Sequence, residues 1–387
     1  MSAIGGMVNW NSESIDSRPL FEMSRAMMLR AGAHRDAFVQ KQIALVQNHT
    51  RSDRVRMPQS MSPEGRRVTA VLDGNPSFSS VGEEFFETFF DLSSPETLLD
   101  AYRSQRETLW DVLSGPFALA IADEARAELY LARDGDGARP LFYREEEGTL
   151  YFASEIKALL PTLRSVARID AGRLRAHLIS PYGVFFGEDL YRDLESLPAG
   201  CTAVWSRLGL RVFRNESGAS TAAGGAVDFS STELYFPGEK ELDQILTELL
   251  YAFDYPQFDY LMPALLCELG ERRLRGLPRE LCFEDPSLCM SLRYARERAD
   301  RIGALRGVLL TPRAPYRFFA KERELRRLEK TMRSLLGSID TAPLKYLLGD
   351  RWSEEILRQK NTAKRIRMEG MAYQTLLWEK SRPLLLS

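Results

Sequence analysis

The sequence has few cysteines and histidines, no long apolar run and almost no net charge. Its 387 residues include four cysteines without a CxxC pair, and three histidines, His34, His49 and His177, without metal-ligand spacing. Neither a disulfide framework nor a metal site is therefore indicated, and packing is the expected role of each histidine. No apolar run approaches the roughly 20 residues that cross a bilayer, and the amino terminus lacks a secretory pattern. We expect a cytoplasmic protein with no membrane partner.

A hydrophobic content of 44%, a charged content of 27% and a net charge of -2 are those of an ordinary folded protein. The length predicts two or three domains. In the first half, RRVTAVL predicts a strand that runs into the turn Asp73-Gly74-Asn75-Pro76. A helix is predicted in SSPETLLDAYRSQRETLWDVL, followed by short strands in GPFALAIAD, AELYLARD and RPLFYREEEGTLYFAS, linked as an antiparallel meander. This half is predicted to be α+β.

The pattern changes after about residue 214. Residues 215–232 are rich in Gly, Ser, Ala and Thr and predict a linker. Beyond them, apolar residues recur at helical spacing, so residues 233–387 are predicted to be mostly α-helical. Residues 271–330 carry an excess of basic side chains, but these alternate with acidic ones as on solvated helices. Nucleic acid is therefore not an expected partner.

The chain opens with MSAIGGMVNW, which places a hydroxyl directly behind the initiator Met. Removal of Met1 would leave a free α-amino group beside the Ser2 hydroxyl, the base and nucleophile of an N-terminal-nucleophile hydrolase. A small second residue is also common in proteins simply because Met is removed there. On these ten residues alone we favour the second reading.

A family resemblance appears in GPFALAIAD, LYLARDGDGARPLFY and LYFASEIKALL, between Gly115 and Leu160. This run resembles the glutaminase domain of the asparagine synthetase family, and LESLPAGCTAVWSRLGLRVFRN is similar to the end of that domain. The resemblance implies a four-layer αββα sandwich over residues 1–214, in which the residue freed by Met removal attacks the amide of glutamine and releases ammonia. It also implies a second domain that activates a carboxylate with ATP.

Several residues of the glutamine site depart from the family pattern. Ser2 stands where glutamine-hydrolysing members have a Cys, and Asp73-Gly74-Asn75 is the best match to their Asn-Gly-Glu turn. An ionised Asp accepts hydrogen bonds but donates none, so Asp73 would oppose a developing oxyanion. The arginine that would grip the substrate carboxylate is matched only loosely by Arg51, and the acidic residue for its amino group aligns with Ser94. We therefore expect a degenerate oxyanion and substrate turn.

The part of the motif that remains is the part that builds the sheets. Two readings are open for Arg133, Asp134, Arg139 and Glu155: an interdomain relay, or turn, cap and ion-pair residues. Asp-Gly turns and acidic residues at helix starts are common features of folds, so we favour the structural reading.

The second half departs further from the family. It has no SGGxDS loop, and Gly224-Gly225 follows no strand that could open a phosphate cradle. The acidic loop for magnesium and pyrophosphate is also missing. The remainder resembles only the helical periphery of a synthetase domain, with Lys345 the weak candidate for a phosphate contact and Lys360 nearby in sequence. No cofactor is expected, and ATP with Mg would bind only if this degenerate domain retains a site.

These observations predict an asparagine-synthetase-like protein that is catalytically degenerate and acts as a binding, scaffold or regulatory partner in a biosynthetic pathway. We expect a homo- or hetero-oligomer, with an active synthetase or a peptide substrate as its partner. Two alternatives stay open: an amidotransferase or amide hydrolase that uses Ser2, and an ATP-dependent amide ligase that modifies peptides.

Overall fold

The computed structural model shows two compact units. One consists of Met1–Arg164 with Asp193–Ala222, and the other of Ser165–Arg192 with Ala223–Ser387. The predicted linker lies outside the described residues except for Asn215. The residues that the structure describes are 2–11, 14–49, 59–61, 67–74, 76–78, 95–135, 137, 139–163, 167–179, 190–215, 238–253, 322–360, 362–381 and 385–386.

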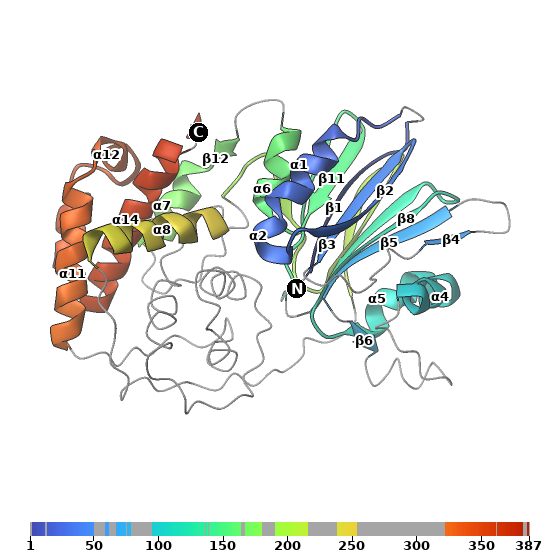
Figure 1. Ribbon diagram of the computed structural model, residues 1–387, viewed down its shortest axis with the longest axis horizontal. Helices are drawn as coiled ribbons and strands as arrows, with labels where there is room; N and C mark the ends of the chain where they lie inside the picture. Colours follow the sequence, from blue (N-terminus) through green and yellow to red (C-terminus); the bar gives the residue numbers. More distant parts are fainter. Residues whose placement is uncertain are drawn as a thin grey trace. The chain divides into compact units, whose positions relative to one another are not determined.

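The first unit contains two six-stranded antiparallel sheets (Figure 1). The first sheet has the order β13-β10-β11-β1-β3-β2, with β1 (Ser2–Asn9), β2 (His34–Gln40), β3 (Ile43–His49), β10 (Phe142–Glu146), β11 (Thr149–Ala153) and β13 (Glu195–Ser196). The second sheet has the order β15-β14-β9-β8-β5-β4, with β4 (Gln59–Met61), β5 (Arg67–Gly74), β8 (Phe117–Asp123), β9 (Glu128–Arg133), β14 (Cys201–Ser206) and β15 (Gly209–Arg214). A short pair, β6 (Ser77–Phe78) and β7 (Leu113–Ser114), lies apart from both.

The two sheets pack face to face through alternate side chains. Ile4, Leu45 and Phe152 of the first sheet and Val71 and Trp205 of the second belong to one buried cluster. Side chains point alternately to the two faces of a strand, so this cluster forms the layer between the sheets.

Helices cover the outer faces of both sheets. A second buried cluster joins Leu98, Tyr102 and Trp110 to Ile121 and Val204 on the far side of the second sheet. On the first sheet, the helix pair α1 and α6 contacts β1, β3 and β11. The αββα sandwich implied by the family resemblance is therefore confirmed. These helices are α1 (Arg18–Ala26), α2 (Met28–Ala31), α4 (Pro95–Gln105), α5 (Leu109–Val112) and α6 (Ile156–Leu159), with 3-10 turns η1 (Arg106–Thr108) and η2 (Leu160–Thr162).

Two local predictions are corrected by the structure. The predicted meander is wrong, because β8 and β9 lie in the second sheet whereas β10 and β11 lie in the first. Strand alternation cannot show that the chain changes sheets between Arg133 and Phe142. The helix predicted after Ser94 is interrupted at η1, where Arg106 has φ +47°, a conformation that ends regular α-helix.

The described residues of the second unit are mostly helical, as predicted for residues 233–387. Its elements are β12 (Arg168–Ile169), α7 (Ala171–Ile179), α8 (Glu239–Phe253), α11 (Glu322–Gly337), α12 (Ala342–Leu348), α13 (Trp352–Arg358), α14 (Thr362–Ser381) and β16 (Leu385–Leu386). Helix α14 packs against α7, α8, α11, α12 and α13, which explains why its residues from Ile366 to Leu376 are buried. In the described part of the chain, no helix has the length and apolar character needed to cross a membrane.

Candidate active site

Ser2 and Asp73 meet where β1 and β5 approach each other. Ser2 lies two residues before Ile4, and Asp73 two residues after Val71, so both side chains belong to the inner faces of the sandwich. The Ser2 Oγ donates a hydrogen bond to Asp73 Oδ1 at 2.9 Å. The Gly74 N–H donates to Ser2 Oγ at 3.1 Å. The structure thus brings together three of the four predicted site residues, and Asn75 lies outside the described residues.

The Asp73 carboxylate is surrounded by donors. Arg30 Nη2 lies 2.6 Å from Asp73 Oδ2, the Ser154 Oγ donates to the same oxygen at 3.3 Å, and Arg139 Nη1 lies 3.6 Å from Oδ1. The Asp73 side chain is fully buried and that of Arg30 is 3% exposed. Burial of a charge is costly unless it is paired and hydrogen-bonded, and here two guanidinium groups and two hydroxyls meet that need.

Gly74 fixes the backbone beside the nucleophile position. Its φ of +107° favours glycine, and a Cβ built there would lie 2.1 Å from the Pro116 carbonyl oxygen. No larger residue fits without a backbone shift. The strand therefore ends with its Gly74 N–H held toward Ser2, which fixes one donor of the site.

This geometry limits the chemistry that the site can do. Hydrolysis of an amide needs donors aimed at the oxygen that becomes negative. Both oxygens of the Asp73 carboxylate are hydrogen-bond acceptors, and one of them accepts a hydrogen bond from the Ser2 hydroxyl. The Gly74 N–H donates to Ser2 Oγ itself, and the Arg30 guanidinium donates to Asp73 and to the Ser2 carbonyl.

Comparison with known proteins identifies the domain that holds this site. The glutamine amidotransferase domain family matches residues 1–214. The chain belongs to this family. Asparagine synthetase 3 of Bacillus subtilis (strain 168) is 29% identical over 195 residues, which are 47% of this chain and 30% of that protein. Asparagine synthetase B of Escherichia coli (strain K12) is 37% identical over 81 residues, which are 21% of this chain and 15% of that protein.

The chain therefore matches less than a third of the length of these relatives. Among solved structures, glutamine phosphoribosylpyrophosphate (PRPP) amidotransferase from B. subtilis, complexed with ADP and GMP, gives a TM-score of 0.39 at 14% identity. That match covers 64% of this chain and 57% of the other, and a TM-score this low supports no conclusion about the present protein.

Within this amidotransferase domain, sequence reasoning missed Arg30. The arginine follows Met23 and Met27, which are fully buried, and its Nε also donates to the Ser2 carbonyl at 3.4 Å. The available signal was a cation, Arg30, directly after the apolar run AMML. Arg51 and Ser94, which we had matched to substrate contacts, lie outside the described residues.

The residues considered for a relay make contacts typical of turns and ion pairs. Arg133 donates to the carbonyls of Leu197 at 2.8 Å and Gly137 at 2.9 Å. Asp134 accepts the Arg139 N–H at 2.9 Å. These bonds hold the segment that carries the chain from one sheet to the other. In the same region Glu155 and Lys157 form a buried pair at 3.2 Å.

Two of the three histidines lie together, although they are scattered in the sequence. His34 and His49 are strand partners whose rings stack with centroids 5.9 Å apart. His49 Nε2 lies 3.4 Å from Asp36 Oδ2, and His49 is also the strand partner of Ser2. Among the described residues, no cluster of three or more His, Cys, Asp or Glu side chains is placed to hold a metal ion.

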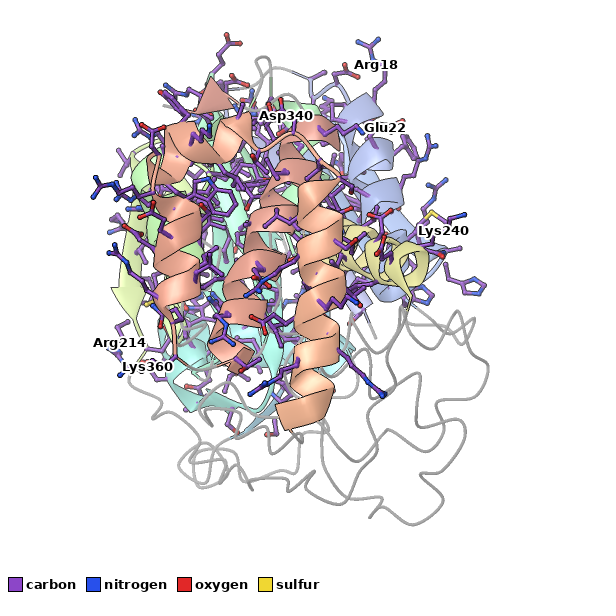
Figure 2. The ribbon with its side chains drawn as sticks, turned by 90° about the vertical axis from the view of Figure 1, so that its left-hand side faces the viewer. Arg18, Glu22, Arg214, Lys240, Asp340 and Lys360 are labelled. Atoms are coloured by element: carbon purple, nitrogen blue, oxygen red, sulfur yellow. The ribbon has the colours of Figure 1, made fainter. Side chains whose placement is uncertain are left out.

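The weak candidate for a phosphate contact belongs to the second unit. Lys345 is exposed on α12. Lys360, which is labelled in Figure 2, is exposed after α13. Exposed lysines on short helices are ordinary surface residues. Their positions give no support to a nucleotide site.

Proposed function

We propose that this asparagine-synthetase-like amidotransferase domain does not hydrolyse glutamine and that the chain acts as a binding or scaffold partner in a biosynthetic pathway. The hydrogen bond from Ser2 Oγ to the buried Asp73 carboxylate, at 2.9 Å, is the observation that supports this most. It holds the Ser2 hydroxyl against a buried carboxylate, and a carboxylate at the turn that would supply an oxyanion donor has no proton to donate. Arg30 stabilises the carboxylate there, so the arrangement is part of the folded core.

A glutaminase assay on the full chain tests the first half of the proposal. Purified protein is incubated with L-glutamine, and glutamate release is compared with that of Ser2→Ala. We expect equal, background rates. Turnover by the unmodified chain above the Ser2→Ala control would contradict the proposal.

One observation favours a second candidate, an amide hydrolase that uses Ser2. The Gly74 N–H lies 3.1 Å from Ser2 Oγ and is held there by a backbone that only glycine adopts. An N-terminal nucleophile also needs a free α-amino group as its base. Intact-mass measurement of the purified chain separates the candidates, because a retained Met1 or an acetylated terminus excludes this hydrolase.

The partner half of the proposal needs its own experiment. Sedimentation of the chain alone, and mixed with an intact asparagine synthetase from the same organism, would show a homo- or hetero-oligomer as an increase in mass. A chain that stays monomeric in both samples would contradict the predicted role.

No described residue favours the ATP-dependent ligase. A thermal shift with ATP and Mg, compared with Lys345→Ala, would test it.

A further inference from the structure

The edge of the second sheet carries an unusual group of side chains. Strand β15 is the last strand in its sheet and pairs only with β14 among the described strands. An edge strand presents unpaired backbone N–H and C=O groups along one side. In Figure 2, Arg214 is labelled beside the yellow-green strand at the left-hand margin of the view.

Apolar side chains are exposed along this hairpin on both faces of the sheet. Leu208 is 94% exposed, Val212 44% and Phe213 39%. Val212 pairs with Ala203, which faces the layer between the sheets, whereas the neighbouring Phe213 points to the opposite face. Exposed apolar side chains grouped in this way are typical of an interaction surface.

The same hairpin has charge of one sign only. Arg207, Arg211 and Arg214 are all exposed, and within the described residues none of them forms a salt bridge. The charge of Arg211 helps to lower the pKa of Glu128, but the salt bridge of Glu128 is with Arg126, at 2.5 Å. The edge strand of the other sheet, β2, carries charges of both signs, on Arg35 and Asp36.

We infer that β15 is a docking edge for an extended acidic segment of a partner protein, which adds to the sheet as a further strand. Strand addition supplies main-chain hydrogen bonds, and side chains on alternate faces of the added strand supply specificity. In an added strand, acidic residues opposite Arg211 and Arg214 and apolar residues opposite Val212 and Phe213 would give each face of the sheet one ion pair and one apolar contact. This surface is separate from the Ser2 site, so the inference stands whether or not Ser2 hydrolyses amides.

A second copy of this chain is a poorer occupant. Antiparallel pairing of two β15 strands would gather Arg211 and Arg214 of both copies along one seam that contains no acidic residue, and registers that set an arginine opposite an arginine would place like charges side by side. Like charges at neighbouring positions of paired strands are destabilising. The arginines therefore repel self-association and still attract a strand of opposite charge.

The test uses the full chain and a defined probe. The probe is a fluorescein-labelled peptide of eight residues with the repeat Glu-Val-Val-Glu, which places acidic and apolar side chains on both faces of a strand, and the control peptide has Lys in place of each Glu. We expect saturable anisotropy for the acidic peptide only, weakened at about 0.15 M salt by screening. Arg211→Glu/Arg214→Glu should weaken binding roughly tenfold, and Arg35→Glu, on the edge of the other sheet, less than about twofold.

Hydrogen exchange on the unmodified chain separates strand addition from loose charge attraction. Because backbone amides of a strand point alternately to its two sides, the acidic peptide should slow exchange at every second amide of residues 209–214. Binding without this protection, no anisotropy change up to about 1 mM peptide, or equal binding of both peptides would overturn the inference. So would tighter binding of a single-stranded oligothymidylate of the same charge, or self-association lost in Arg211→Glu/Arg214→Glu.

Discussion

The two units each bury a cluster of charged side chains, and the clusters differ in how completely they are satisfied. In the first unit, Asp73 has partners on both carboxylate oxygens and no exposure. In the second unit, Glu329 and Glu369 lie between α11 and α14. Arg365 Nε is 2.7 Å from Glu329 and Arg333 Nε is 2.8 Å from Glu369.

The second cluster is open in two respects. The Arg333 side chain is 46% exposed, so solvent screens its charge. Glu369 is buried, and within the described residues its Oε2 has no hydrogen-bond partner. Burial accordingly raises the pKa of Glu369 above its usual value, although Arg333 opposes the shift. In the open cluster, the buried Glu369 carboxyl is thereby favoured in its protonated form.

The largest expected effect comes from removing the cation of the closed cluster. Arg30→Ala leaves the fully buried Asp73 carboxylate without its closest partner, and should cost about 3–5 kcal/mol in the free energy of unfolding. Arg333→Ala, in the open cluster, should cost only about 1 kcal/mol, because its side chain is 46% exposed and the buried Glu369 that it leaves behind has a raised pKa and can take up a proton. Urea denaturation of both variants measures the difference. Equal losses would show that closure of the Asp73 cluster does not matter.

The next effect concerns the backbone that holds the closed cluster. Gly74→Ala should destabilise the protein by about 2 kcal/mol or more, since a left-handed φ and a collision with the Pro116 carbonyl both oppose it. Gly209→Ala is the matched control: its φ is +99°, but nothing lies within 4 Å of the added Cβ. It should cost only about 1 kcal/mol, for the backbone alone. If both variants melt at the same temperature, the steric argument at Gly74 is wrong.

The smallest effect is a pH dependence of the open cluster. Because the pKa of Glu369 is higher in the folded chain than its ordinary 4.5, its contribution to stability is largest below that value and falls as pH rises through the raised pKa. Glu369→Gln does not titrate, so it should become more stable relative to the unmodified chain as pH increases. Melting temperatures across this range test the sign. A constant difference in melting temperature between the two proteins across this range would contradict the prediction.

Sequence reasoning gave the broad organisation and part of the site. Alternation identified β5, β8 and β9, and helical periodicity identified α8 and α11, because these patterns are local. It also placed a carboxylate at Asp73 beside Ser2. It could not supply Arg30, which lies 43 residues from Asp73 in the chain and contacts it only because α2 packs on the first sheet. Sequence reasoning also could not show that β10 and β11 lie in a different sheet from β8 and β9, because strand pairing depends on residues far apart in the chain.

The sequence by itself determined the strand and helix patterns, which are properties of residues close together in the chain, and its family resemblance assigned Ser2 and Asp73 to one site. Only the tertiary structure decided what that acidic residue does. Tertiary packing brings Ser2, Arg30 and Ser154 within hydrogen-bonding distance of the Asp73 carboxylate. A carboxylate that sequence reasoning reads as a repulsive charge thereby becomes a neutralised, fully buried part of the core.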